Sequence, residues 1–139
     1  MLIKKDLTAS AVDRQNILNN KIAIDNIQEN IGISRMFFKG EYRFTKLQVC
    51  DFYSVNISTR ERYLSSNEEE LKHNGYENLK GKSLKEFKEE FGWVLLEGSK
   101  APQLGVFNFR AFLNLGMLLT ESEKAKALRS VVLDIVIDT

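Results

Sequence analysis

The segment 56–62 carries closely spaced polar side chains of the types that contact DNA, namely Asn, Ser, Thr, Glu and Arg. On the outer face of a helix lying in the major groove, such groups reach base edges and phosphates. We therefore expect DNA contacts from Asn56, Ile57, Ser58, Thr59, Arg60, Glu61 and Arg62. Lys46, together with Lys80 and Lys82 of an expected turn, is predicted to bind phosphate groups beside that helix.

The residues of catalytic types lack the partners that catalysis needs. His73 is the only histidine and lies in an acidic segment with no nucleophile nearby, so it is interpreted as a solvated surface residue. Cys50 is the only cysteine, which excludes an internal disulfide and a cysteine-rich zinc site. No glycine-rich phosphate loop occurs. We expect no enzyme activity, no cofactor, no metal and no small-molecule substrate.

Two short helices are expected to position the candidate DNA-contacting residues, as a helix-turn-helix over 45–65. Thr45 is predicted to cap a helix over 46–53 and Ser58 a helix over 59–65, with a turn of about four residues between them. Cys50 is small enough for the close contact between the helices. The other expected inward residues are Val49, Tyr53, Val55, Tyr63 and Leu64. The same spacing also fits a helical hairpin that binds no ligand.

A resemblance favours the DNA-binding interpretation. Residues 44–64 read FTKLQVCDFYSVNISTRERYL and, with VFNFRAF at 106–112 and the helix that follows, resemble the DNA-binding domains of the RhuM, KilA-N and Bro-N group of phages and prophages. The resemblance implies a sequence-preferring, double-stranded DNA-binding domain of a phage, prophage or mobile-element regulatory protein. The helix near 58–65 would read the major groove. Two positions depart from the pattern: Arg60 replaces an expected Ile or Val, and Ser54 replaces the usual Gly.

Hydrophobic periodicity and turn residues predict an α+β fold that is mostly helical. Helices are expected over 10–19, 22–30 (ended by Gly32), 67–75, 83–91 and 110–118, and a capping box at 120–123 opens a C-terminal helix. A β-hairpin over 36–44 turns at Lys39-Gly40, and further strands cover 76–80, 94–96 and 104–109. The turn at Lys80-Gly81-Lys82 is expected to form a wing over 76–82.

The expected division along the chain is a helical region over 1–100 and a strand with helices over 101–139, packed as one domain. This domain is expected either to begin a longer protein or to bury its C-terminal helix against a second copy. The only plausible linker is the loop at 98–102. Residues 33–65 hold six basic and three acidic side chains, whereas 66–100 hold six basic and eight acidic ones. The basic excess of the first stretch is compatible with DNA, although the whole chain has a net charge of only +1.

The C-terminal helix suggests a protein partner. Its apolar stripe at helical spacing comprises Ala127, Leu128, Val131, Val132, Ile135 and Val136. We expect this stripe to support a homodimer, and the alternative function is a protein-interaction module, antitoxin-like or antirepressor, that docks a partner through it. The sequence has no apolar run long enough for a membrane span, so a cytoplasmic protein without a membrane partner is expected.

Overall fold

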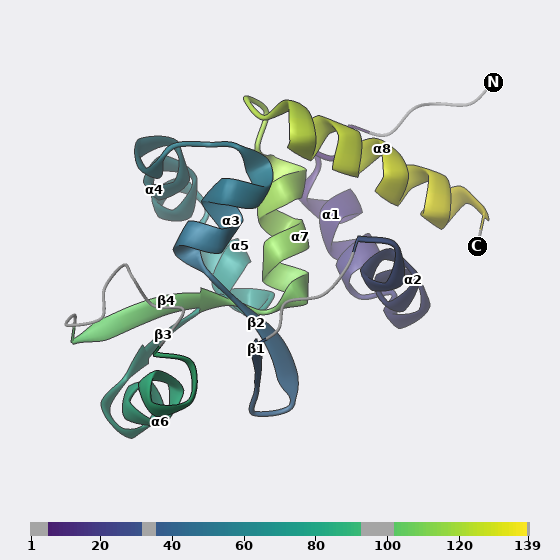
Figure 1. Cartoon of the computed structure of the whole chain (residues 1–139). Coiled ribbons are helices and arrows are strands. Elements are labelled where there is room, and N and C mark those ends of the chain that lie inside the picture. The colour runs from purple at the N-terminus through teal and green to yellow at the C-terminus, as the bar shows by residue number, and fades with distance from the viewer. Residues whose placement is uncertain (1–5, 32–35, 93–101, 139) are drawn as a thin grey trace.

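A computed structural model describes residues 6–31, 36–92 and 102–138 (Figure 1). Within these ranges the fold is α+β and mostly helical, as predicted, with eight helices and four strands. The helices are α1 (Ala11–Leu18), α2 (Lys21–Ile31), α3 (Lys46–Tyr53), α4 (Ile57–Ser66), α5 (Glu68–His73), α6 (Gly81–Phe91), α7 (Phe109–Leu118) and α8 (Glu123–Asp138). The strands are β1 (Met36–Phe38), β2 (Glu41–Thr45), β3 (Glu77–Lys80) and β4 (Gln103–Phe107).

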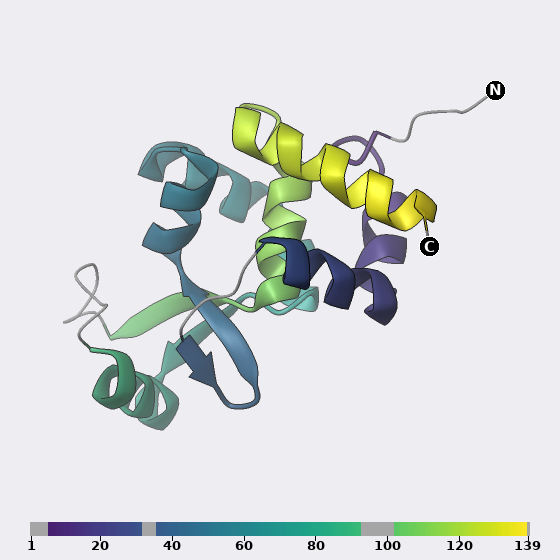
Figure 2. The ribbon, with the colours of Figure 1, turned by 45° about the vertical axis from the view of Figure 1, so that its right-hand side comes forward.

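Helix α7 is the centre of the helical part of the molecule. Every side chain of α7 except Arg110 is buried, and the helix contacts α1, α5 and α8 as well as β2 and β4. Figures 1 and 2 show it passing beneath α8 from two directions. Asn108 caps α7, since its side-chain oxygen accepts a hydrogen bond from the Ala111 amide at 2.8 Å. A helix that is apolar all round needs neighbours on every side, and these elements provide them.

The four strands form one antiparallel sheet in the order β1-β2-β4-β3. β1 and β2 make the predicted hairpin, in which Lys39 and Gly40 both have positive φ angles, as a tight two-residue turn requires. Helix α6 covers one face of the sheet and packs Leu84, Phe87 and Phe91 against it. The other face adjoins the helical core, so the sheet lies between α6 and the remaining helices (Figure 1).

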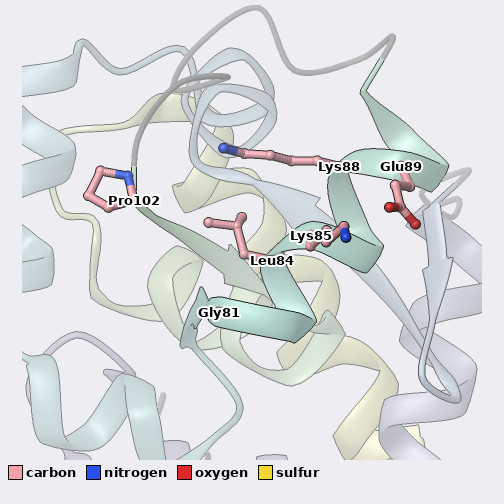
Figure 3. Close-up of a pocket in the computed structure, with 6 residues that line it drawn as sticks. All are labelled: Gly81, Leu84, Lys85, Lys88, Glu89 and Pro102. Atoms are coloured by element: carbon pink, nitrogen blue, oxygen red, sulfur yellow. The ribbon is translucent and has the colours of Figure 1, made fainter.

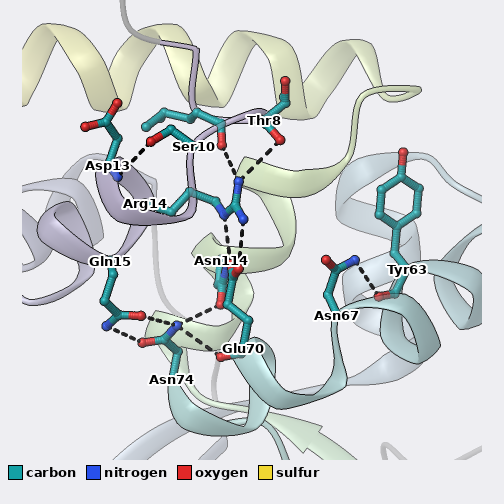
Figure 4. Close-up of polar contacts among 11 residues, drawn as sticks. Thr8, Ser10, Asp13, Arg14, Gln15, Tyr63, Asn67, Glu70, Asn74 and Asn114 are labelled. Atoms are coloured by element: carbon teal, nitrogen blue, oxygen red, sulfur yellow. Dashed lines mark hydrogen bonds and ion pairs between the residues drawn. The ribbon is translucent and has the colours of Figure 1, made fainter.

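A buried polar network joins α1, α5 and α7 (Figure 4). The Arg14 guanidinium donates two hydrogen bonds of 2.8 Å to the Glu70 carboxylate, and Asn114 donates a third at 2.5 Å. Asn74 is fully buried and donates to the Asn114 side chain at 2.8 Å. Burial alone would raise the pKa of Glu70, but these hydrogen bonds and the Arg14 charge together lower it. The network therefore fixes α5, which follows α4 directly, to the central helix.

Most of the predicted elements are confirmed, but several boundaries are wrong. Asn56, not Ser58, caps α4, so that helix starts two residues earlier than predicted. Ser122, not Thr120, accepts the capping hydrogen bond of α8 from the Ala125 amide. None of the described helices combines the length and apolar character needed to cross a membrane. Gly32, the predicted strand over 94–96 and most of the predicted linker loop lie outside the described residues.

The segment predicted as a wing takes a different form. β3 ends at Lys80 and α6 begins at Gly81, so the expected turn is a junction between a strand and a helix. β3 pairs with β4, which comes more than twenty residues later and inserts between β3 and β2. Residues on both sides of position 100 therefore share one sheet.

Candidate nucleic-acid interface

Helices α3 and α4 are joined by three residues, 54–56. α3 starts with a complete capping box, in which Thr45 accepts from the Gln48 amide and the Gln48 side chain accepts from the Thr45 amide. It ends at Ser54, whose backbone is left-handed with φ 53° and ψ 46°. Asn56 then caps α4 by accepting from the Thr59 amide at 2.7 Å. Side chains thus fix the start of both helices, and one left-handed residue sets the change of direction.

The inner side of this helix pair is anchored to α7 and α8. Val49 and Tyr53 are fully buried, as predicted. The Tyr53 hydroxyl donates to the Phe112 carbonyl at 2.7 Å, and burial raises its pKa well above the ordinary value. Ser122 donates to the Tyr53 carbonyl at 2.6 Å. A side chain at Gly116 would collide with Tyr53, because an added Cβ would lie 2.4 Å from its hydroxyl oxygen. α3 therefore has one fixed position on the core.

Arg60 is buried, which corrects the prediction that it faces DNA. Only 3% of the residue is exposed, since it lies one helical turn before Leu64 on the inner face of α4. Its guanidinium contacts Glu61 at 2.7 and 2.9 Å and donates to Cys50 Sγ at 3.6 Å. This contact joins α4 to α3 at Cys50, the residue predicted for the close approach of the two helices. Position 60 therefore faces inward, as the expected Ile or Val would. The ion pair with Glu61 compensates the buried charge of Arg60.

The remaining predicted residues of α4 lie on its outer side. Ile57 is 53% exposed, Ser58 and Glu61 are exposed, and Arg62 has 57% of its side chain exposed. Thr59 is partly buried. Asn56 is exposed, but its side-chain oxygen is occupied by the cap. α4 lies at an edge of the molecule in both orientations shown in Figures 1 and 2, and its first two residues, Ile57 and Ser58, are exposed.

Two ion pairs partly neutralise this outer side. Lys46 lies 3.4 Å from Glu61, and Arg62 lies 2.5 Å from Glu121 of the turn before α8. Burial would raise the pKa of Glu61, but hydrogen bonds and charge from Arg60 and Lys46 outweigh it and lower that pKa. Sequence reasoning missed Glu121, because no local pattern connects two residues that are 59 positions apart.

Lys46 also reaches the sheet. It crosses β4 at Gly105, where an added Cβ would lie 2.6 Å from Lys46 Cε. Asn78 pairs with Gly105, and Lys80 lies two residues further along β3, on the same face because side chains alternate along a strand. Lys80 is therefore about 7 Å further along the strand than the point where Lys46 crosses. The structure brings Lys46 and Lys80 to one face of the sheet, the face toward α3.

Lys82 is placed elsewhere, in the first turn of α6. It is exposed and lies 3.9 Å from Glu86. Further along α6, an open groove of about 500 Å³ runs between the helix and Pro102 (Figure 3). In this view Lys88 extends along the groove toward Pro102, and Lys85 and Glu89 also line it. Lys82 thus belongs to the helix below the sheet and not to the α4 face.

The outer side of α4 carries few cations, so any contact that it makes with a polyanion would involve few residues. Exposed hydroxyl, apolar and guanidinium groups lie together on α4. Lys46 is ion-paired with Glu61 of this helix, and Lys80 lies on the sheet face that Lys46 crosses. Comparisons of the chain with protein-family models, curated proteins and solved structures gave no match.

Proposed function

We propose that this chain is a sequence-preferring, double-stranded DNA-binding domain of a regulatory protein from a phage, prophage or other mobile element. In this proposal α3 and α4 act as a helix-turn-helix, and α4 enters the major groove. The observation that carries the proposal is the first half of α4, whose Ile57 and Ser58 are exposed at the edge of the molecule while its inner side is fixed by Arg60. The resemblance of residues 44–64 to the RhuM, KilA-N and Bro-N group points the same way.

The residue types on α4 match what a recognition helix presents to bases. The first residues of such a helix contact base edges. Ile57 supplies an apolar surface for a thymine methyl group, and the Ser58 hydroxyl either donates or accepts a hydrogen bond. Arg62 lies further along the helix and, once released from Glu121, has the fork of donors that guanine or a phosphate binds.

Lys46 and Lys80 are the proposed phosphate contacts beside α4. Both occupy the face of the sheet toward α3, so β3 and β4 would take the place of a wing next to the recognition helix. Lys46 must exchange Glu61 for phosphate when DNA binds. Because few cations are available and two are already paired, the proposal implies modest affinity and a shallow dependence on salt.

The proposal is tested by selecting bound duplexes from a random DNA pool with the purified chain at low salt. The expected result is enrichment of a short motif. A duplex that contains this motif should bind the chain more tightly than a duplex of scrambled sequence. Recovery of an unenriched pool, with no retention of duplex DNA at any salt concentration, contradicts the proposal. Enrichment of single-stranded sequences alone contradicts it as well, since a helix in the major groove requires a duplex.

A further inference from the structure

An open apolar groove lies between α3 and α8, and none of its lining residues belongs to α4. Its lining residues are Phe52, Lys124, Ala127, Leu128 and Val131, and its volume is about 360 Å³. Phe52 is 38% exposed and Val131 41% exposed. Exposed aromatic and branched side chains that adjoin one groove commonly mark a protein interface.

The exposed residues of α8 beside this groove form a stripe whose charge changes from positive at one end to negative at the other. Lys124, Ala127, Val131 and Asp134 are all exposed and recur at three- and four-residue spacing. The stripe begins with a cation, has a small and then a larger apolar residue, and ends with an acid. Among the residues that the structure describes, neither Lys124 nor Asp134 has an ion-pair partner within α8 or on its neighbours.

The neighbouring face of α8 is already used inside the chain. Val132 is fully buried and Leu128 is 7% exposed, both in the main core. Ile135 is partly buried against the same core. The predicted apolar stripe is therefore divided: part of it is ordinary core, and Ala127 and Val131 remain outside. Only the outer part is left for a partner.

We propose that a second copy of this chain covers the groove, with the two α8 helices packed antiparallel about a two-fold axis. In this register Ala127 of each copy faces Val131 of the other, so that a small side chain meets a larger one. The same register places Lys124 opposite Asp134, because the pair 127 and 131 and the pair 124 and 134 are both centred on position 129 of α8. The two-fold axis repeats each contact, and a surface that is complementary to itself is what a two-fold dimer requires.

The polarity of the stripe is the reason for choosing a second copy over another partner. A parallel arrangement of two α8 helices would set lysine beside lysine and acid beside acid. The antiparallel arrangement makes two opposite-charge contacts about 15 Å apart, with the apolar residues between them. Phe52 of α3 flanks these apolar residues in each copy. The dimer does not depend on DNA binding by α4.

Charge-reversal variants of the full chain test the register by sedimentation velocity. Lys124→Glu alone sets acids against Asp134, and Asp134→Lys alone sets lysines against Lys124, so each variant should dimerise at least about tenfold more weakly than the natural chain. An equimolar mixture of the two variants should recover the affinity, because a heterodimer restores both opposite-charge contacts. Lys85→Glu makes the same charge change on α6 and should leave the dimer constant unchanged.

Several results would overturn the inference. A natural chain that stays monomeric at the highest soluble concentration has no such dimer. If the single variants dimerise with the affinity of the natural chain, any dimer uses another surface. The same follows if the mixture dimerises as weakly as each variant alone. Because Lys124, Asp134 and Lys85 are exposed, the three variants are expected to fold, and far-ultraviolet circular dichroism checks this directly. DNA binding by the natural chain is measured separately, so failure of the dimer leaves the proposed function untouched.

Discussion

Glu121 and Arg62 show how two exposed side chains far apart in the sequence set the charge of a surface. Their ion pair, together with that of Lys46 and Glu61, leaves the α4 face with less positive charge than its arginine and lysine content indicates. A hydrogen bond to Glu121 and the charge of this acid raise the pKa of Arg62. An acid that competes with phosphate lowers the affinity for DNA.

We predict that Glu121→Gln strengthens DNA binding. The change releases Arg62 and removes one negative charge near the phosphates, which should increase affinity by about two- to fivefold at low salt. Glu123→Gln is the matched control, because Glu123 is an exposed acid two residues away with no ion pair among the described residues. Fluorescence anisotropy with a labelled duplex measures both. Equal changes in the two variants would mean that Arg62 is not specifically involved.

Ser54 occupies a left-handed backbone position that favours glycine. We predict that Ser54→Gly raises the free energy of unfolding by about 0.5–1 kcal/mol, since glycine removes the steric cost and the serine side chain is exposed. Ser65→Gly, at an exposed position inside α4, should instead lower stability by about as much. Thermal unfolding of both variants decides the matter, and a destabilised Ser54→Gly protein would show that the left-handed position carries no strain.

At the scale of the element, the sequence predicts most helices and strands but not which cap or face is used. Asn56 and Ser58 are both good capping residues two positions apart, so local propensity does not choose between them, and packing of α4 on α3 decides. Arg60 is an ordinary surface type, and its burial depends on Glu61 and Cys50 together. The wing was predicted from neighbouring residues, whereas β3 pairs with a strand that follows a whole helix.

The contact between α3 and α4 at Cys50 predicts how the helix pair responds to a larger side chain. Cys50→Leu should lower the free energy of unfolding by about 1–3 kcal/mol, because the larger side chain meets Arg60 and pushes the helices apart. Cys50→Ser keeps the size of the side chain and is the control, with a smaller expected loss. Chemical denaturation followed by circular dichroism measures both, and a Leu variant as stable as the natural chain would mean that the contact tolerates added volume.

At the scale of the whole molecule, helices from distant parts of the chain depend on the polar network around Glu70. Arg14, whose side chain is 8% exposed, has its charge compensated by this one carboxylate among the described ion pairs. The depressed pKa of Glu70 means that the folded state holds the ionised form more strongly than the unfolded state does. The stability it contributes is complete above about pH 4.5, the ordinary pKa, and is lost as the pH falls through the lowered value.

We predict that Glu70→Gln weakens the fold at neutral pH and reduces the loss of stability below pH 4.5, since the titrating group is gone. Glu69→Gln alters an exposed neighbour with no ion pair in the described part of the chain, and it should keep the natural pH dependence. Melting temperatures between pH 3 and pH 7 provide the comparison. If both variants followed the pH profile of the natural chain, the network would not depend on the charge of Glu70.

The most direct test of the account is the salt dependence of duplex DNA binding by the natural chain, Arg62→Ala and Lys72→Ala. Both residues are exposed and ion-paired, Arg62 on the proposed DNA face of α4 and Lys72 with Glu68 on α5. We predict that the natural chain binds and that Arg62→Ala alone weakens binding, with a salt slope shallower by about one if the contact is to phosphate. Absence of duplex binding at low salt, or an equal loss in both variants, would contradict it.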